Sequence, residues 1–206
     1  MRGIPGGFYM QLIAENLACV RGGREVFADV GFALGAGEAL LVTGRNGAGK
    51  SSLLRLIAGL IRRAGGTLTL AGGDAELTIG EQAHYLGHQD AIKATLTVAE
   101  NLRFWCGYLG GAPKAALEPV GLADLAQLPA GYLSAGQKRR LSLARLVAIK
   151  RPLWLLDEPT SVLDETSRGR LADLMRAHLA GGGMIIAASH GPIGLERARE
   201  LRMDSA

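Results

Sequence analysis

The sequence is poor in cysteine and contains no long apolar run. Its two cysteines, Cys19 and Cys106, lie far apart and form no CxxC pair, which argues against a zinc site or a disulfide framework and favours a reducing compartment. No apolar stretch approaches the roughly 18 residues that a membrane-spanning helix needs. Residues 1–9 lack the apolar segment of a secretory signal. We therefore expect one domain over residues 10–206, and residues 1–9 are either a flexible extension or the result of an upstream start codon.

Aromatic residues are also scarce, and the net charge selects no partner. Aromatics make up 5% of the chain and apolar residues 48%, and glycine occurs 30 times. This composition predicts one α/β domain with a large core and many tight turns. The formal charge of +4 suits nucleotide phosphates, an anionic membrane surface or nucleic acid equally.

Apolar periodicity predicts strands that alternate with helices. The predicted strands are 38–43, 67–70, 83–86, 153–156 and 184–188. The predicted helices are 51–60, 139–149 and about 165–179. This alternation predicts a mainly parallel sheet, and the alternating pattern of 67–70 predicts a small antiparallel part.

A helical subdomain is predicted within this α/β core, over about residues 91–145. Thr97, followed three residues later by Glu100, has the sequence pattern of a capping box. We expect the chain from about Ala91 to Leu133 to be helical, with breaks at residues 110–113 and at Pro129.

The segment GRNGAGKS predicts a phosphate-binding loop between a strand and a helix, the context that this motif requires. Its glycines leave room for backbone N–H groups to point at a phosphate, and the helix N-terminus adds a positive dipole end. Lys50 would reach the β- and γ-phosphates, and the Ser51 hydroxyl would ligate Mg²⁺. The residues predicted to hold the nucleotide here are Gly44, Arg45, Asn46, Gly47, Ala48, Gly49, Lys50, Ser51 and Ser52.

The segment LWLLDEPT, Leu153–Thr160, predicts a second part of the same site. Asp157 ends the strand, where its carboxylate can hold Mg²⁺ through water. Glu158 points the other way in an extended chain, which suits a general base for attack by water. Alone, this pair is equally typical of a strand that ends in a solvated acidic turn, and the neighbouring motifs favour a site.

Three further motifs follow the phosphate loop in one order: LSAGQ at Leu133–Gln137, SVLD at Ser161–Asp164, and His190 after an apolar run. Together these motifs resemble the ATP-binding cassette (ABC) ATPases over nearly the whole chain. The resemblance implies an ABC-type phosphate-loop fold with ATP and Mg²⁺ as cofactors. It also implies a head-to-tail dimer in which two copies of the chain sandwich two ATP molecules.

The resemblance further implies roles for single residues. In the dimer, Ser134, Gly136 and Gln137 would lie against the γ-phosphate held by the partner, and Asp164 would lie at the dimer seam. Gln89 matches the glutamine loop, which senses Mg²⁺ and the attacking water and couples to a membrane partner. The implied catalytic residues are Glu158, His190 and Gln89, and the implied metal ligands are Ser51, Gln89 and Asp157.

Two stretches need separate interpretation. Lys138–Arg140 follows LSAGQ, and we predict a solvated basic helix face there rather than a nucleic-acid site. ABC ATPases usually carry an aromatic residue upstream of the phosphate loop that stacks on adenine, but the stretch CVRGGREVF has none before Phe27. Either Arg21, through its planar guanidinium, or Phe27, from outside the usual position, would take that place.

Within the family, the segments YLGHQ at Tyr85–Gln89 and LTVAENLRFW at Leu96–Trp105 resemble the ATP-binding subunits of bacterial haem exporters used in cytochrome c maturation. That resemblance implies a peripheral ATP hydrolase on the cytoplasmic side of the inner membrane, docked on integral membrane subunits. ATP hydrolysis would drive release or transfer of haem held by a periplasmic haem chaperone.

Two alternatives remain open at this stage. One is the ATPase of another ABC exporter, serving a drug, a peptide or a lipid. The other is a soluble ABC ATPase acting on DNA or the ribosome, which would need a tandem cassette or a long coiled coil that the sequence lacks. We expect no nucleic-acid partner, and no haem ligation by His84, His88 or Cys106, because the sequence has no CxxCH motif.

Overall fold

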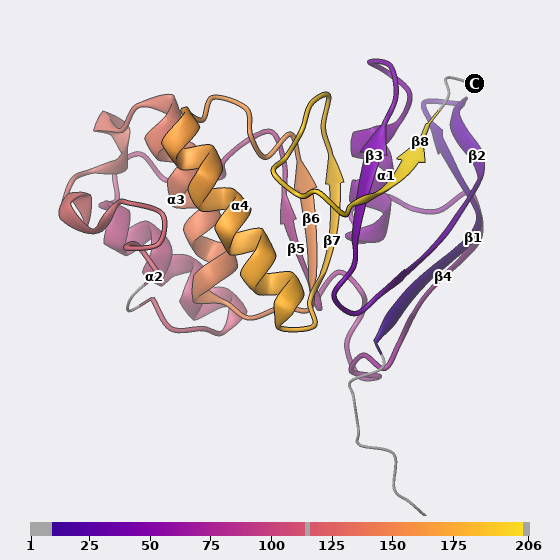
Figure 1. Cartoon of the computed structure of the whole chain (residues 1–206), viewed down its shortest axis with the longest axis horizontal. Helices are drawn as coiled ribbons and strands as arrows, with labels where there is room; N and C mark the ends of the chain where they lie inside the picture. The colour runs from indigo at the N-terminus through magenta and orange to yellow at the C-terminus, as the bar shows by residue number, and fades with distance from the viewer. Residues whose placement is uncertain (1–9, 114–115, 204–206) are drawn as a thin grey trace, which may run out of the picture.

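Two β-sheets organise the computed structural model, which describes residues 10–113 and 116–203 (Figure 1). The larger sheet is parallel, with the order β5 (Ala83–Leu86), β6 (Leu153–Asp157), β7 (Met184–Ala188), β3 (Ala39–Thr43), β8 (Arg199–Arg202). The smaller sheet is antiparallel, with the order β2 (Arg24–Gly35), β1 (Gln11–Arg21), β4 (Gly65–Ala71). The predicted α/β class, mainly parallel with a small antiparallel part, is confirmed. The extension predicted over 1–9 lies outside the described residues.

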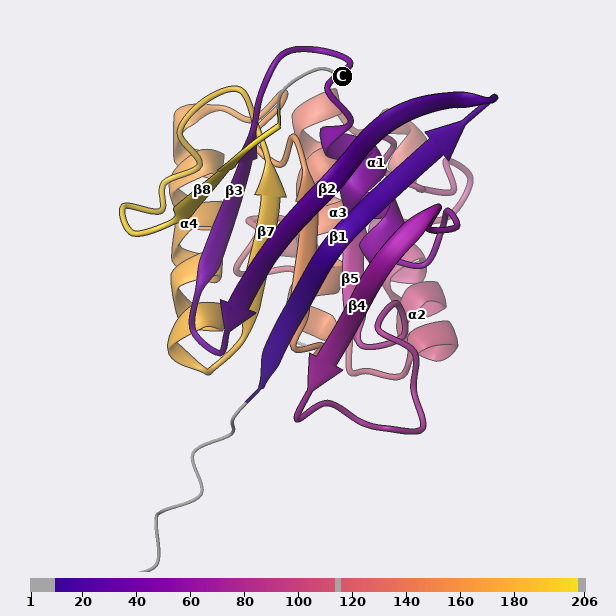
Figure 2. The ribbon, with the colours of Figure 1, turned by 90° about the vertical axis from the view of Figure 1, so that its right-hand side faces the viewer.

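Helices and the second sheet cover opposite faces of the parallel sheet. In Figure 1, α2 (Val98–Leu109), α3 (Ala135–Ala148) and α4 (Glu165–Ala180) lie on one side of it, and α1 (Lys50–Ile57) lies on the other with the antiparallel sheet. Figure 2 shows β1, β2 and β4 crossing in front of the parallel strands. The parallel sheet is thus the middle layer, and its strand ends are free to carry a site.

The alternation of side chains along the central strands supplies a separate apolar core on each face. On β6, Trp154 and Leu156 face the core shared with α2, α3 and α4, whereas Leu153 and Leu155 face the core shared with α1 and the antiparallel sheet. All five residues of β6 and all five of β7 are buried. A strand that is apolar on both faces is what a doubly covered parallel sheet requires.

The segment predicted as helical over 91–133 is only partly so. Thr97 and Glu100 form the predicted capping box at the start of α2, but α2 ends at Leu109. Beyond it, within the described residues, only two short 3₁₀ turns occur, at Ala123–Leu125 and Ala130–Tyr132. Glycine and proline in this stretch stop the helix. The assignment of 91–145 as an inserted subdomain stays a prediction.

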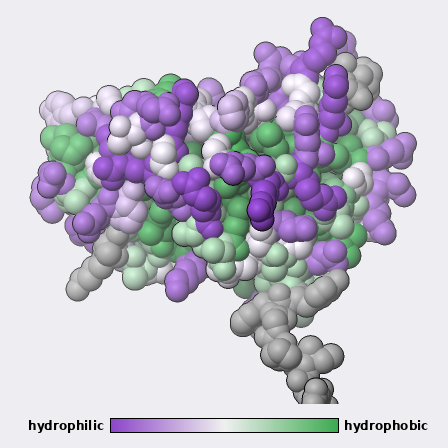
Figure 3. Space-filling model, in the orientation of Figure 1, coloured by the Kyte–Doolittle hydropathy of each residue, from purple (hydrophilic) through white to green (hydrophobic). Residues whose placement is uncertain are grey.

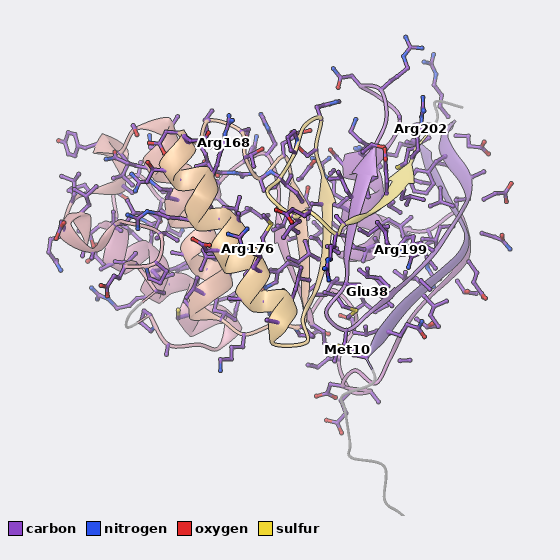
Figure 4. All side chains as sticks on the ribbon, viewed as in Figure 1. Met10, Glu38, Arg168, Arg176, Arg199 and Arg202 are labelled. Carbon is purple, nitrogen blue, oxygen red and sulfur yellow. The ribbon has the colours of Figure 1, made fainter. Side chains whose placement is uncertain are left out.

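The outer face of α4 is polar. Hydrophilic residues cover much of the surface over this helix in Figure 3, and Figure 4 shows Arg168 and Arg176 extending from it. Arg176 donates to Asp173 at 2.6 Å within the same helix. Such exposed pairs contribute little to stability, so α4 is held by its buried side, which includes Leu171 and Met175.

Among residues 10–113 and 116–203, no helix combines the length and the apolar composition that crossing a bilayer requires.

His84 makes the folded chain sensitive to acid. It lies buried on β5, with Nε2 at 2.8 Å from the carbonyl oxygen of Ile149. Burial lowers the pKa of His84 from its usual value near 6.5 to about 4. The unfolded chain therefore takes up this proton at a higher pH than the folded chain does. The stabilisation is complete above pH 6.5 and is lost as the pH falls from 6.5 towards 4.

We expect His84 to account for about 2 kcal/mol of lost unfolding free energy between pH 6.5 and 5, since one pKa unit corresponds to about 1.4 kcal/mol. Urea denaturation at pH 7.5 and pH 5 measures this loss, and His84→Gln removes the titration while keeping a donor for Ile149. If the variant loses as much stability as the unmodified chain, His84 is not the group responsible.

Candidate active site

A cavity of about 300 Å³ opens where β3 and β6 end, close to the end of β7. The arrows of β3 and β7 point the same way in Figure 1, so the loops that follow them meet at one edge of the sheet. The cavity is lined by Val26, Asn46, Gly47, Gly49, Lys50, Ser51, Ser52, Asp157, Glu158 and His190. Residues from the phosphate loop, the acidic strand end and the histidine segment, predicted separately from the sequence, thus share one cavity.

The phosphate loop has the backbone that its glycines predict. Gly44, Gly47 and Gly49 all have positive φ, and a Cβ on Gly44 would collide with the carbonyl oxygen of Met203. Lys50 is 7% exposed, and its Nζ donates to the carbonyl oxygens of Gly44 at 2.8 Å and Arg45 at 3.0 Å. The loop thus curls around the ammonium group at the start of α1, which leaves a concentrated positive charge beside the cavity.

Ser51 and Asp157 meet at the base of the cavity. The Ser51 hydroxyl donates to Asp157 Oδ1 at 2.9 Å, which brings together two of the three predicted metal ligands. No sequence motif indicated Tyr85, whose hydroxyl donates to Asp157 Oδ2 at 3.5 Å and accepts from Arg55 Nε at 3.1 Å. The position of Tyr85 on β5, the strand paired with β6, is the signal that points to this contact.

Glu158 does not lie in extended chain, and that part of the prediction is wrong. Its φ is +47°, a left-handed conformation that costs a non-glycine residue about 1–2 kcal/mol. Its N–H donates to the carbonyl oxygen of Ala188 at 2.9 Å, which ties Glu158 to the end of β7. In this conformation Glu158 Oε1 lies 3.7 Å from His190 Nε2. The two side chains, 29% and 53% exposed, face the cavity together.

The LSAGQ segment lies elsewhere on the chain. Ser134 caps α3, where its hydroxyl accepts from Gln137 N at 3.2 Å and its N–H donates to Gln137 Oε1 at 2.8 Å. A Cβ on Gly136 would approach the carbonyl oxygen of Val162 to 3.0 Å. Ser134 is exposed. Ser134, Gly136 and Gln137 are not among the described residues that line the cavity of their own chain.

Gln89 and Asp164 also lie outside the cavity lining, as far as the described residues show, and so do Gly44, Arg45 and Ala48 of the phosphate loop. Gln89 is exposed in the loop after β5. Asp164 is exposed and caps α4 by accepting from Ser167 N at 2.8 Å, and this hydrogen bonding lowers the pKa of Asp164. In a single chain, the structure therefore groups the phosphate loop, Asp157, Glu158 and His190, and leaves the remaining predicted residues apart.

Two sequence-based interpretations need correction. Arg139 is not on a solvated face: it is 1% exposed and bonded to backbone carbonyls beside Asp157. Phe27 is 4% exposed and belongs to the core next to the antiparallel sheet, so it is not available to stack on a base. Val26, its neighbour, lines the cavity, and Arg21 is exposed at the end of β1.

Comparisons with known proteins bear on the family and on the fold. The family model described as ABC transporter matches residues 27–161. Residues along 94% of the chain superpose on a structure titled "Structure of ATP binding subunit of ABC transporter", with a TM-score of 0.84, 24% identity and 87% of that chain covered. A structure titled "Structure of a bacterial Atm1-family ABC exporter with ATP bound" gives a TM-score of 0.81 at 22% identity, over 96% of this chain and 38% of that one. At these identities the two structures bear on the fold alone.

Curated relatives share more than half of their residues with this chain. The chain is 60% identical over 200 residues to "Cytochrome c biogenesis ATP-binding export protein CcmA" of Rhodopseudomonas palustris strain BisB18, which covers 96% of this chain and 100% of that protein. It is 59% identical to the protein of the same name from Bradyrhizobium diazoefficiens, over 94% of this chain and 98% of that protein.

The fold and the family match define the class: the chain belongs to the ABC transporter family of ATP-binding proteins. Within that class, sequence identity along nearly the whole chain places it in the family of cytochrome c biogenesis ATP-binding export proteins.

Proposed function

We propose that this chain is the ATP-hydrolysing subunit of an ABC exporter that acts in cytochrome c biogenesis, where ATP hydrolysis drives release or transfer of haem held by a periplasmic chaperone. The observation that carries the proposal is the single cavity in which Lys50, the Ser51–Asp157 pair and the Glu158–His190 pair meet. The identity to export proteins of that pathway supports the choice of system.

ATP would bind with its phosphates over the loop from Gly44 to Ser52. Backbone N–H groups and the N-terminus of α1 stabilise negative charge there, and Lys50 would exchange its loop carbonyls for phosphate oxygens. The Ser51 hydroxyl oxygen and Asp157 Oδ1 lie 2.9 Å apart, and oxygen atoms of this kind are the ligands that Mg²⁺ prefers. Ser51, Asp157 and Gln89 would hold this ion, whose charge, when bound, offsets that of the phosphates.

Glu158 would act as the general base. Its carboxylate faces the cavity beside His190, where it would take a proton from the water that attacks the γ-phosphate. The His190 ring would donate a hydrogen bond to the charge that develops on the γ-phosphate oxygens. Both groups are partly exposed, which suits a site that closes only when a further surface covers it.

That further surface would be the LSAGQ segment of a second copy. Ser134 is exposed at the N-terminus of α3 and is not among the described residues that line its own cavity. A hydroxyl, a glycine and a helix N-terminus together form an anion site. In a head-to-tail dimer, Ser134, Gly136 and Gln137 would cover the partner's nucleotide, with Asp164 at the seam. Two copies would then complete two sites.

The dimer would dock on integral membrane subunits of the same transporter, on the cytoplasmic side of the inner membrane. Gln89 is exposed on the loop after β5, where it would contact the metal and the attacking water and would couple them to the docked subunits. This arrangement would transmit closure of the dimer to the membrane subunits and, indirectly, to the haem chaperone.

Deletion of the gene tests the choice of cargo. We expect cells without this chain to lose covalent haem from their c-type cytochromes, as shown by a peroxidase stain for haem on a denaturing gel. The wild-type gene should restore the stain, whereas a Glu158→Gln gene should not. Retained staining in the deletion strain would contradict the haem assignment and favour an exporter of another substrate.

A further inference from the structure

One buried arginine connects three segments of the site, although it does not line the cavity. Arg139 lies on α3 and is 1% exposed. Its Nη2 donates to the carbonyl oxygens of Asp157 at 2.9 Å and Glu158 at 2.8 Å, and its Nη1 donates to the carbonyl oxygen of Gly87 at 2.8 Å. Its only ion pair among the described residues is with Asp90 Oδ1, at 3.2 Å.

Burying a guanidinium with only one countercharge costs desolvation free energy, and apolar residues of similar volume often stabilise a fold at least as well. Its planar fork is instead suited to fixing several acceptors in one geometry. The acceptors belong to the end of β6 and to the loop over residues 87–90. The arginine itself belongs to the helix that Ser134 caps.

The loop that carries Gln89 is fixed to α3 on both sides of that residue. Gly87 accepts from Arg139, and the carbonyl oxygen of Asp90 accepts from the Ser142 hydroxyl at 2.8 Å. Gln89, between these two anchors, is exposed. Movement of α3 would therefore carry the Gln89 loop with it.

The left-handed backbone of Glu158 is hydrogen-bonded to the same arginine. A left-handed non-glycine residue persists only where its surroundings hold it. The N–H of Glu158 is held by Ala188, and its carbonyl oxygen accepts from Arg139 Nη2 at 2.8 Å and from the Ser161 hydroxyl at 2.9 Å. This conformation is the one in which the Glu158 carboxylate lies beside His190.

We propose that Arg139 is a positioning residue for ATP hydrolysis: it holds Glu158 in its left-handed conformation and ties Glu158 to the Gln89 loop and to the helix of the LSAGQ segment. The proposal rests on the proposed function. Because α3 begins at the surface expected to cover the partner's nucleotide, Arg139 links that surface to the general base of its own chain. Among the described residues it does not line the cavity and donates no hydrogen bond to the phosphate loop, so its loss should affect turnover rather than ATP affinity.

Arg139→Lys tests the proposal in the full chain assembled with its membrane subunits. The variant keeps the charge but lacks the fork that reaches both sets of carbonyls. Misplacement of a catalytic group by about 1 Å costs on the order of 100-fold in rate, so we expect kcat to fall about 10- to 100-fold while the Kd for ATP changes less than about threefold. The Hill coefficient for ATP should also fall towards 1.

Arg151→Lys is the matched control. Arg151 Nη1 also donates to two backbone carbonyl oxygens, those of Gly80 at 3.2 Å and Ala83 at 2.8 Å, but at the opposite end of β5. This control should leave kcat, Kd and the Hill coefficient unchanged. Arg151 is only partly buried, so thermal destabilisation that both variants share reports the loss of a guanidinium bonded to backbone carbonyls rather than of positioning.

Asp90→Asn provides a second variant that keeps an acceptor for Arg139 and loses only the charge. It should lower kcat as Arg139→Lys does, but by less, and the double variant should lose less activity than the product of the two single effects.

An Arg139→Lys complex with wild-type kcat overturns the proposal. If that variant does not fold, an unchanged kcat in Asp90→Asn overturns it instead. A wild-type complex without ATP hydrolysis would contradict the proposed function itself.

Discussion

Replacing Glu158 with glutamine should reduce ATP hydrolysis by about 10²- to 10⁴-fold, the usual contribution of a general base, and leave ATP binding nearly unchanged. The amide has the same shape as the carboxylate but does not accept a proton from water. The backbone contacts of Glu158 with Ala188 and Arg139 do not involve its side chain, so the site should keep its geometry. Phosphate release and nucleotide binding, measured on the assembled transporter, give the two quantities.

The same substitution should also hold the two cassettes together in the presence of ATP, because the nucleotide that joins them is not consumed. Glu76→Gln is the matched control, since Glu76 is exposed in the loop between β4 and β5, outside the cavity lining, and should behave as the wild type. Full ATPase activity in the Glu158→Gln complex would remove Glu158 from the role of base.

Replacing Lys50 with alanine should weaken ATP binding itself. Lys50 is buried and lines the cavity, where its ammonium group would meet the β- and γ-phosphates. A hydrogen bond to a charged group contributes about 1.5–3 kcal/mol, so the Kd for ATP should rise about 10- to 150-fold. Isothermal titration with ATP measures this change directly.

Lys150→Ala controls for the loss of a positive charge, because Lys150 is exposed just beyond the C-terminal end of α3. Its ATP affinity should equal that of the wild type. Equal affinity in Lys50→Ala would reject the assignment of Gly44–Ser51 as the phosphate loop. Unfolding curves of both variants are needed, because Lys50 also bonds two carbonyl groups of the loop in the free chain.

Much of the parallel sheet was predictable because its central strands are buried on both faces and therefore read as apolar runs. β3, β5, β6 and β7 fall within a residue or two of their predicted ranges. The edge strand β8, Arg199–Arg202, was not predicted. Its sequence, RELR, is charged, and it becomes a strand only through parallel pairing with β3.

The hairpin of β1 and β2 was missed for a different reason. Register shifts interrupt the pairing near Leu17 and Cys19, and Asn16 and Asp29 adopt positive φ. Each irregularity breaks the alternation of buried and exposed residues, which is the signal that predicts a strand. Tertiary pairing with β4 on the other edge completes this sheet.

The site likewise has parts that local sequence predicts and parts that depend on tertiary contacts. The phosphate loop and the acidic strand end were predictable because their chemistry is contained in short local motifs, whereas His190 was predictable only from its place after the other motifs of the family. The left-handed turn at Glu158 and the burial of Arg139 were not, because both depend on contacts between segments far apart in the sequence. An arginine in a run of three basic residues looks solvated until the carbonyls of β6 are placed beside it.

The central claim is that one chain supplies only part of each ATP site and its partner supplies the rest. The most direct test assembles transporters from two differently tagged copies, one carrying Lys50→Ala and the other Ser134→Arg. Each variant alone should lack ATP hydrolysis, since every site then has one defect. The mixed complex should regain activity, because the intact Lys50 of one copy meets the intact Ser134 of the other. Wild-type hydrolysis by the complex that carries Ser134→Arg in both copies would contradict the claim.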